Sequence, residues 1–113
     1  RALLQTKDHI HTMRTIAQIF MDCQEFSTAA STLGEIEEVV KGAEYDDTRA
    51  EIIKAICPAQ AYCYYQTGHK AEFLHYLQMS IILNPNDTQF FFRDIFPKEA
   101  RPEDYLFYAR DLE

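Results

Sequence analysis

The segment from Tyr64 to Pro85 constrains the fold of this chain more than any other. It begins with Tyr64-Tyr65-Gln66-Thr67-Gly68-His69-Lys70-Ala71 and ends with Leu83-Asn84-Pro85-Asn86, and the proline follows the glycine by seventeen residues. Glycine after a helical pattern predicts a tight turn, and proline after a helical pattern predicts the end of the helix. The segment therefore predicts two antiparallel helices with a short turn between them and a firm stop after the second.

Length and composition favour one helical domain. The chain has 113 residues, enough for a modest core, and its 47% hydrophobic content excludes a disordered tail. Three glycines and four prolines are few, which favours long helices over a turn-rich β fold. Because the sequence begins at Arg1 without a methionine, we expect a single domain from a longer protein. No apolar stretch approaches the roughly 20 residues of a membrane span, so no membrane association is expected.

The charge of the chain argues against one class of partner. The net charge is −7 and the eleven basic residues are scattered, so we expect no binding of nucleic acid through its phosphates. Acidic residues are concentrated between residues 35 and 51. This segment contains seven Asp and Glu residues and only two basic residues, Lys41 and Arg49. We interpret this run as a solvated helix end and loop. The alternative is a docking site for a basic partner segment.

No pattern of catalytic or metal-binding residues is present. The three cysteines, Cys23, Cys57 and Cys63, follow no metal-ligand spacing and are predicted to be buried free thiols. Free thiols indicate a reducing compartment, hence an intracellular protein, cytoplasmic or nuclear. The histidines at 69 and 75 drift around a helix rather than converge on a metal. Without a nucleophile elbow, phosphate loop or HExxH motif, we expect neither an enzyme nor a bound cofactor.

Apolar residues recur at three- and four-residue steps, which predicts an all-α fold of five to seven helices. The expected helices span residues 6–23, 26–41, 48–67, 69–83 and 88–96, and a last helix begins at Pro102. The predicted ends are a cap at Thr6, Gly42 at positive φ, a capping box at Thr48, and a cap at Asn86 or Asp87.

Pro58 interrupts the third of these helices. Either the helix kinks near Lys54 or a new helix begins at Pro58, and a kinked or broken pair is favoured over a loop. The helix at 69–83 is apolar on most sides, so it should be covered on more than one side.

The two long hairpins are related by an internal repeat. A shift of 44 residues aligns Ala17 with Ala61, Phe20 with Tyr64 and Leu33 with Leu77, and it also superimposes Gln24-Glu25 on Gly68-His69. Each pair joins residues of similar size and polarity. The repeat predicts that the two hairpins have the same architecture.

At these positions the chain resembles a tetratricopeptide repeat. That family places a small residue, an aromatic three later, a glycine four later and a proline seventeen beyond, and Ala61, Tyr64, Gly68 and Pro85 match this spacing. The first hairpin matches with Ala17, Phe20, Phe26, Ala29 and Leu33. The resemblance covers residues 13–41 and 57–86. The chain departs from the family in its spacing of 44 instead of about 34, and in Lys70 and Phe73. An unrelated helical bundle or another class of solenoid is the alternative.

The resemblance implies antiparallel helical hairpins stacked as a short solenoid, acting as a protein–protein interaction module or scaffold. A peptide segment or partner helix would lie in a groove lined by the first helix of each hairpin. The groove positions implied are His11, Arg14, Gln18 and Asp22, then Pro58, Tyr62, Tyr65 and Gln66. The alternative for the polar stripe from His11 to Asp22 is an ordinary solvated face. A clamp for a C-terminal carboxylate is not expected, because the second hairpin offers no basic partner to Arg14.

Three adjacent rings mark a second candidate surface. Phe90, Phe91 and Phe92 point in different directions on a helix, so at least one should be exposed or face a partner. Tyrosine and phenylalanine are common at interfaces. The alternative function is therefore homodimerisation, with the aromatic segment 90–108 packed against a second copy.

Overall fold

The computed structural model describes residues 2–42, 46–97 and 99–111, and the side chains of 9–42, 49–97 and 99–110. All regular structure in these ranges is helical. The elements are α1 (Ala2–Asp22), α2 (Phe26–Lys41), α3 (Asp46–Thr67), α4 (Lys70–Leu83), α5 (Pro85–Phe91), the 3-10 turn η1 (Pro102–Asp104) and α6 (Tyr105–Asp111). The prediction of an all-α fold with five to seven helices is confirmed.

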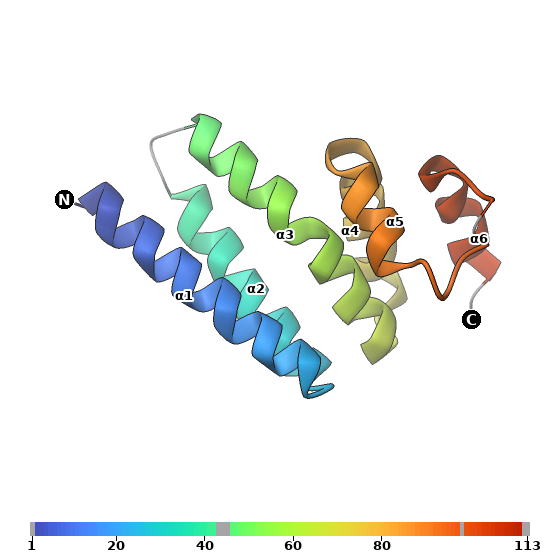
Figure 1. Ribbon diagram of the computed structural model, residues 1–113, viewed down its shortest axis with the longest axis horizontal. Helices are drawn as coiled ribbons and strands as arrows, with labels where there is room; N and C mark the ends of the chain where they lie inside the picture. Colours follow the sequence, from blue (N-terminus) through green and yellow to red (C-terminus); the bar gives the residue numbers. More distant parts are fainter. Residues whose placement is uncertain (1, 43–45, 98, 112–113) are drawn as a thin grey trace.

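The helices follow one another along the long axis of the molecule, which measures 46 × 28 × 21 Å. Figure 1 shows α1 and α2 at one end, α3 in the middle, and α6 at the other end, with α4 behind α5. Each of α1 to α4 packs most extensively on its neighbours in sequence, and α4 also contacts α5 and α6. The apolar residues around most of this helix predicted that other helices would cover it on more than one side, and this prediction is confirmed.

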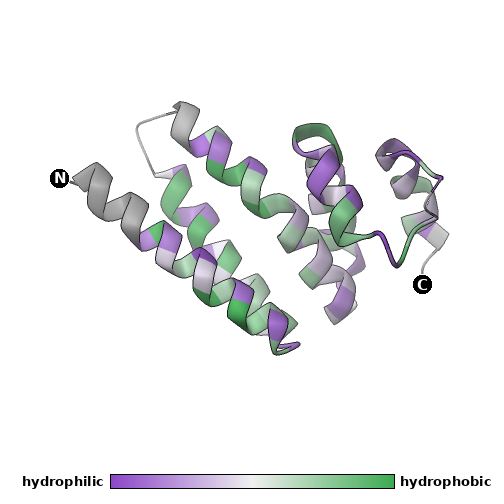
Figure 2. Cartoon of the chain, in the orientation of Figure 1, coloured by the Kyte–Doolittle hydropathy of each residue, from purple (hydrophilic) through white to green (hydrophobic). Residues whose placement is uncertain are grey.

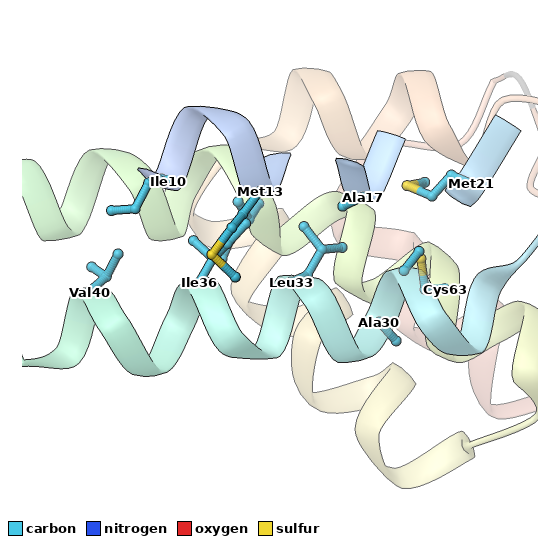
Figure 3. Packing of buried hydrophobic residues seen from close by; sticks show 11 residues of the cluster. Ile10, Met13, Ala17, Met21, Ala30, Leu33, Ile36, Val40 and Cys63 are labelled. Atoms are coloured by element: carbon cyan, nitrogen blue, oxygen red, sulfur yellow. The ribbon is translucent and has the colours of Figure 1, made fainter. Parts of the chain in front are cut away.

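Two apolar cores lie on either side of α3. The first joins α1, α2 and α3, and Figure 3 shows Ile10, Met13 and Ala17 of α1 facing Leu33, Ile36 and Val40 of α2. The second joins the later part of α3 to α4, α5 and α6 through residues such as Phe73, Leu77, Phe92 and Tyr105. Hydrophilic and hydrophobic residues alternate along α1 and α3 (Figure 2), as expected for helices with one buried side. Because α3 serves both cores, it is the central element of the fold.

Helix α3 continues unbroken through Pro58. Of the two alternatives predicted at this position, the one in which a new helix begins at Pro58 is wrong. Proline has no N–H, so the carbonyl of Lys54 loses its partner within the helix. The side-chain Nδ2 of Asn84 donates to that carbonyl at 3.0 Å, and the thiol of Cys57 also donates to it, with its sulfur 3.5 Å away. Asn84, thirty residues after Lys54, therefore replaces the hydrogen bond that Pro58 cannot donate.

The turns after α1 and α3 have the same geometry, 44 residues apart. Gln24 and Gly68 both adopt a left-handed backbone, with φ of 63° and 77°. After each, an N–H reaches back five residues, from Glu25 to the Phe20 carbonyl at 2.7 Å and from His69 to the Tyr64 carbonyl at 3.0 Å. This pattern is the Schellman motif that ends many helices. The turn that was predicted at Gly68 is thus confirmed, and Gln24 forms the same turn without a glycine.

Several predicted helix ends differ from those observed. Helix α1 begins at Ala2, so Thr6 lies inside it rather than capping it. Gly42 ends α2 with φ of −83°, so the positive φ predicted there is wrong. Helix α5 begins at Pro85, and its cap is Asn84 rather than Asn86 or Asp87, because the Asn84 Oδ1 accepts from the Asp87 N–H. Helix α3 begins two residues before Thr48, whose side chain lies outside the described residues.

A carboxylate joins three helices on the side of the molecule formed by α2, α3 and α4. Glu37 of α2 accepts from Tyr76 Oη of α4 at 2.7 Å and from Gln60 Nε2 of α3 at 3.1 Å, and Lys41 lies 3.5 Å from its other oxygen. Burial alone would raise the pKa of Glu37, but these donors outweigh it and hold the pKa below 4.5. Within the acidic run, Glu37 is therefore structural. Glu35, Glu38 and Glu51 are exposed, and the side chains of Glu44, Asp46 and Asp47 lie outside the described residues.

Two of the three cysteines are buried, as predicted, and the third is not. Cys57 and Cys63 are fully buried free thiols, and burial raises their pKa values to about 11 and about 12. Cys23 lies in the turn after α1 and is exposed, so the prediction that it is buried is wrong. The reason is position, because the residue before the left-handed Gln24 faces away from both cores.

Candidate functional site

A cleft of about 440 Å³ opens between α1, α3 and α5. Its lining residues come from four helices: His11, Arg14, Thr15, Ala17, Gln18 and Met21 of α1, Leu33 of α2, Ala55, Ile56 and Ala59 of α3, and Asp87, Phe90 and Phe91 of α5. Residues far apart in sequence thus meet in one concave site. Its volume lies within the range of about 300–1,000 Å³ that is usual for ligand pockets.

The wall formed by α1 is polar. His11, Arg14 and Gln18 are three and four residues apart, so they share one side of the helix, beside the buried stripe that contains Ala17. The Gln18 amide donates to the Asp22 carboxylate at 3.0 Å, and the Thr15 hydroxyl donates to the His11 carbonyl at 3.0 Å. Arg14 is exposed and makes no hydrogen bond or ion pair with another described residue.

The bottom of the cleft is apolar, and small residues give it depth. Leu33 and Ile56 are fully buried beneath it, and Ala55 and Ala59 lie one turn apart on α3 and are half-buried. Alanine leaves space between helices that a larger side chain would fill. Ala55 belongs to neither core cluster, so it serves the surface of the cleft rather than the interior.

The wall formed by α5 is aromatic. Phe90 is 59% exposed, and the guanidinium of Arg93 lies 4.4 Å from the centre of its ring. Phe91 is half-buried, with its ring centre 5.8 Å from that of Tyr62. Asp87 adds a carboxylate, which accepts from Asn84 Nδ2 at 2.9 Å. The exposed Phe90 agrees with the prediction that at least one of the three rings would be uncovered.

Five of the nine residues predicted to bind a partner lie together on this cleft: His11, Arg14, Gln18, Phe90 and Phe91. Four others lie elsewhere. The Tyr62 ring packs among Phe26 and Phe92, with centroids 5.7 Å away in each case, and Phe92 is fully buried. Tyr65 packs on Phe73 at 5.3 Å, and Gln66 is exposed outside the cleft lining. Of the two further groove positions implied by the resemblance, Pro58 is buried and Asp22 is exposed beyond the lining residues.

Sequence reasoning missed the alanines of α3 and the acid of α5. Ala55 and Ala59 flank Pro58 at a spacing of four, which is the signal of a small-residue helix face. For Asp87, the sequence pattern predicts only a helix cap. The position of α5 against α1 could not be inferred, because it depends on how Asn84 docks on α3.

Within the described residues, no three His, Cys, Asp or Glu side chains lie close enough to share a metal ion. None of the helices there is both long and apolar enough to span a bilayer. No protein-family model matches the chain, and no curated protein or solved structure matches it either. The class that fold and cleft define is an all-α protein with a concave site across three helices.

Proposed function

We propose that this chain is a protein–protein interaction module that holds a peptide segment or a partner helix in the cleft between α1, α3 and α5. One observation carries the proposal: a polar wall, a floor of small apolar residues and an exposed aromatic wall face one concave site. Protein partners are recognised by such a combination of aromatic anchors in a pocket with a polar rim.

The arrangement of helices supports the same proposal. Helices α1, α3 and α5 alternate with α2 and α4 along the chain, and they supply every lining residue of the cleft except Leu33 of α2. The two identical turns 44 residues apart indicate two copies of one hairpin design. We therefore propose a tetratricopeptide-like stack, in which the first helix of each pair lines the binding surface. Stacked helical repeats form extended concave surfaces of this kind.

The experiment fills the cleft and leaves the fold intact. The chain is used to select binders from a displayed library of random short peptides, and the binding of the selected peptides is measured by fluorescence polarisation. Ala55→Phe places a ring in the cleft without entering either core, so it should weaken binding by about tenfold or more, ~1.4 kcal/mol. Ala71→Phe, on the exposed side of α4, is the matched control and should bind normally. Equal binding by both variants would contradict the proposal.

Homodimerisation is the second candidate, and a specific observation favours it. Phe107 of α6 is 70% exposed and Tyr108 beside it is 37% exposed, at the end of the stack opposite α1. Most other rings of the segment 90–108 are used within the molecule, since Phe92, Phe96 and Tyr105 are buried. Light scattering over a range of concentrations tests this candidate. A dimer that Phe107→Ser dissociates would support it, and a monomer at every concentration would refute it.

A further inference from the structure

We propose, resting on the proposed function, that the occupant of the cleft is a short amphipathic segment with an acidic side chain next to a bulky apolar one. The acid pairs with Arg14 on the α1 wall. The apolar side chain lies on the alanines of α3 and against Phe90 and Phe91.

Charge complementarity selects the acid. The chain has a net charge of −7, and Arg14 is the permanent cation among the described residues that line the cleft. No described residue pairs with it, whereas Asp87 on the opposite wall is engaged by Asn84. A guanidinium in a concave site offers a planar pair of donors that matches a carboxylate. The α1 wall therefore offers an acidic side chain a cation that no described residue engages.

The apolar bottom of the cleft favours a bulky apolar side chain next to the acid. Ala55 and Ala59 leave a half-open space between the polar wall and Phe90, and buried Leu33 and Ile56 lie beneath it. A bulky side chain placed there would remove its own apolar surface and that of Phe90 from water together. The guanidinium of Arg93 lies over the Phe90 ring, 4.4 Å from its centre.

The length of the polar wall limits the size of the segment. His11 and Gln18 are seven residues apart, which is about 10 Å along a helix at 1.5 Å per residue. That distance matches about two turns of a partner helix or three residues of an extended strand. On a partner helix of that length, side chains three or four positions apart share one side, so we expect the acid and the apolar residue within four positions of each other.

A charge-reversed selection tests the proposal. The same displayed library of random short peptides is selected on the wild-type chain and on Arg14→Glu. We expect the wild type to enrich Asp or Glu within four positions of Leu, Met or Phe, and Arg14→Glu to enrich Lys or Arg at the same place. Wild-type peptides should bind Arg14→Glu at least tenfold more weakly, and Arg14→Lys should retain part of the affinity. Arg110→Glu, the same change on α6 at the far end of the stack, should bind like the wild type.

The outcomes separate this inference from the proposed function. Two outcomes overturn this inference and leave the proposed function standing. In the first, Ala55→Phe blocks binding but the selected peptides show no preference for Asp or Glu. In the second, Ala55→Phe blocks binding but Arg14→Glu binds the wild-type peptides as well as the wild type does. Failure to enrich any peptide, or binding that ignores Ala55→Phe, overturns both. Circular dichroism of each variant checks that helicity is unchanged, which is expected because Arg14 is exposed.

Discussion

At the scale of single residues, the turn at Gln24 shows where this chain stores backbone strain. Its φ of 63° places a glutamine in the left-handed region, where Gly68 stands in the second hairpin at 77°. A residue with a Cβ is disfavoured in this region by about 1–2 kcal/mol. A Cβ at Gly68 would meet no atom within 4 Å, so the cost there is conformational rather than steric contact.

Exchange at these two positions should therefore have opposite effects. We expect Gln24→Gly to raise the free energy of unfolding by about 1 kcal/mol and Gly68→Ala to lower it by about 1 kcal/mol. Urea unfolding followed by circular dichroism measures both. A loss of stability in Gln24→Gly would show that the glutamine side chain contributes more than its backbone conformation costs.

The thiols give a second residue-scale prediction. Cys57 and Cys63 are buried, with pKa values raised to about 11 and about 12, whereas Cys23 is exposed. The reactive species is the thiolate, so the buried pair should be inert in the native state. We expect one fast-reacting thiol with Ellman's reagent at pH 7 and two more only after unfolding. In Cys23→Ser the fast reaction should disappear, and a persisting fast phase would contradict the structure.

At the scale of elements, α3 lacks one helical hydrogen bond at Pro58, and a residue from another segment replaces it. The Lys54 carbonyl that Pro58 leaves without a helical partner accepts from Asn84, which also caps α5. The sequence indicated both the proline in the helical pattern and the stop at residues 84–86. It could not indicate that the two belong together, because their contact spans thirty residues and depends on how α4 packs on α3.

A double-mutant cycle tests this link. Asn84→Ser keeps an efficient capping residue but cannot reach the Lys54 carbonyl, so it should cost about 1–2 kcal/mol of unfolding free energy. In a Pro58→Ala background the restored N–H meets that carbonyl, and the cost of Asn84→Ser should fall by about 1 kcal/mol. Thermal or urea unfolding of the four proteins gives the coupling. Identical costs in both backgrounds would mean that the two residues act independently.

The Glu37 network predicts how stability depends on pH. Its donors hold the pKa below the unfolded value of 4.5, so the unfolded state binds the proton more readily. The stabilisation from Glu37 is thus complete above that value and is lost as the pH falls through the lower folded pKa. We expect the unfolding free energy of wild type to drop more between pH 5 and pH 3 than that of Glu37→Gln. Glu38→Gln, the same change at an exposed neighbour, should follow the wild type.

At the scale of the whole molecule, α3 lies between two cores, and the cleft opens where α1 and α5 flank it. Helical periodicity was enough to predict the class of fold and most of α2, α4 and the hairpin turn at Gly68. It placed His11, Arg14 and Gln18 on one side of a helix for the same reason. Sequence could not assign Tyr62, because an aromatic on α3 suits a groove and a core equally. Tyr62 is half-buried because its ring packs on Phe92, whose position depends on the packing of α5 and α6.

The central claim is that a partner occupies the cleft between α1, α3 and α5. The most direct measurement is a titration of the isotopically labelled chain with a selected peptide, followed by amide shifts in two-dimensional NMR. We predict that the largest shifts cluster at residues 11–21, 55–59 and 87–91, with α6 nearly unchanged. Shifts concentrated around Phe107 and Tyr108, with the cleft residues unmoved, would contradict the claim.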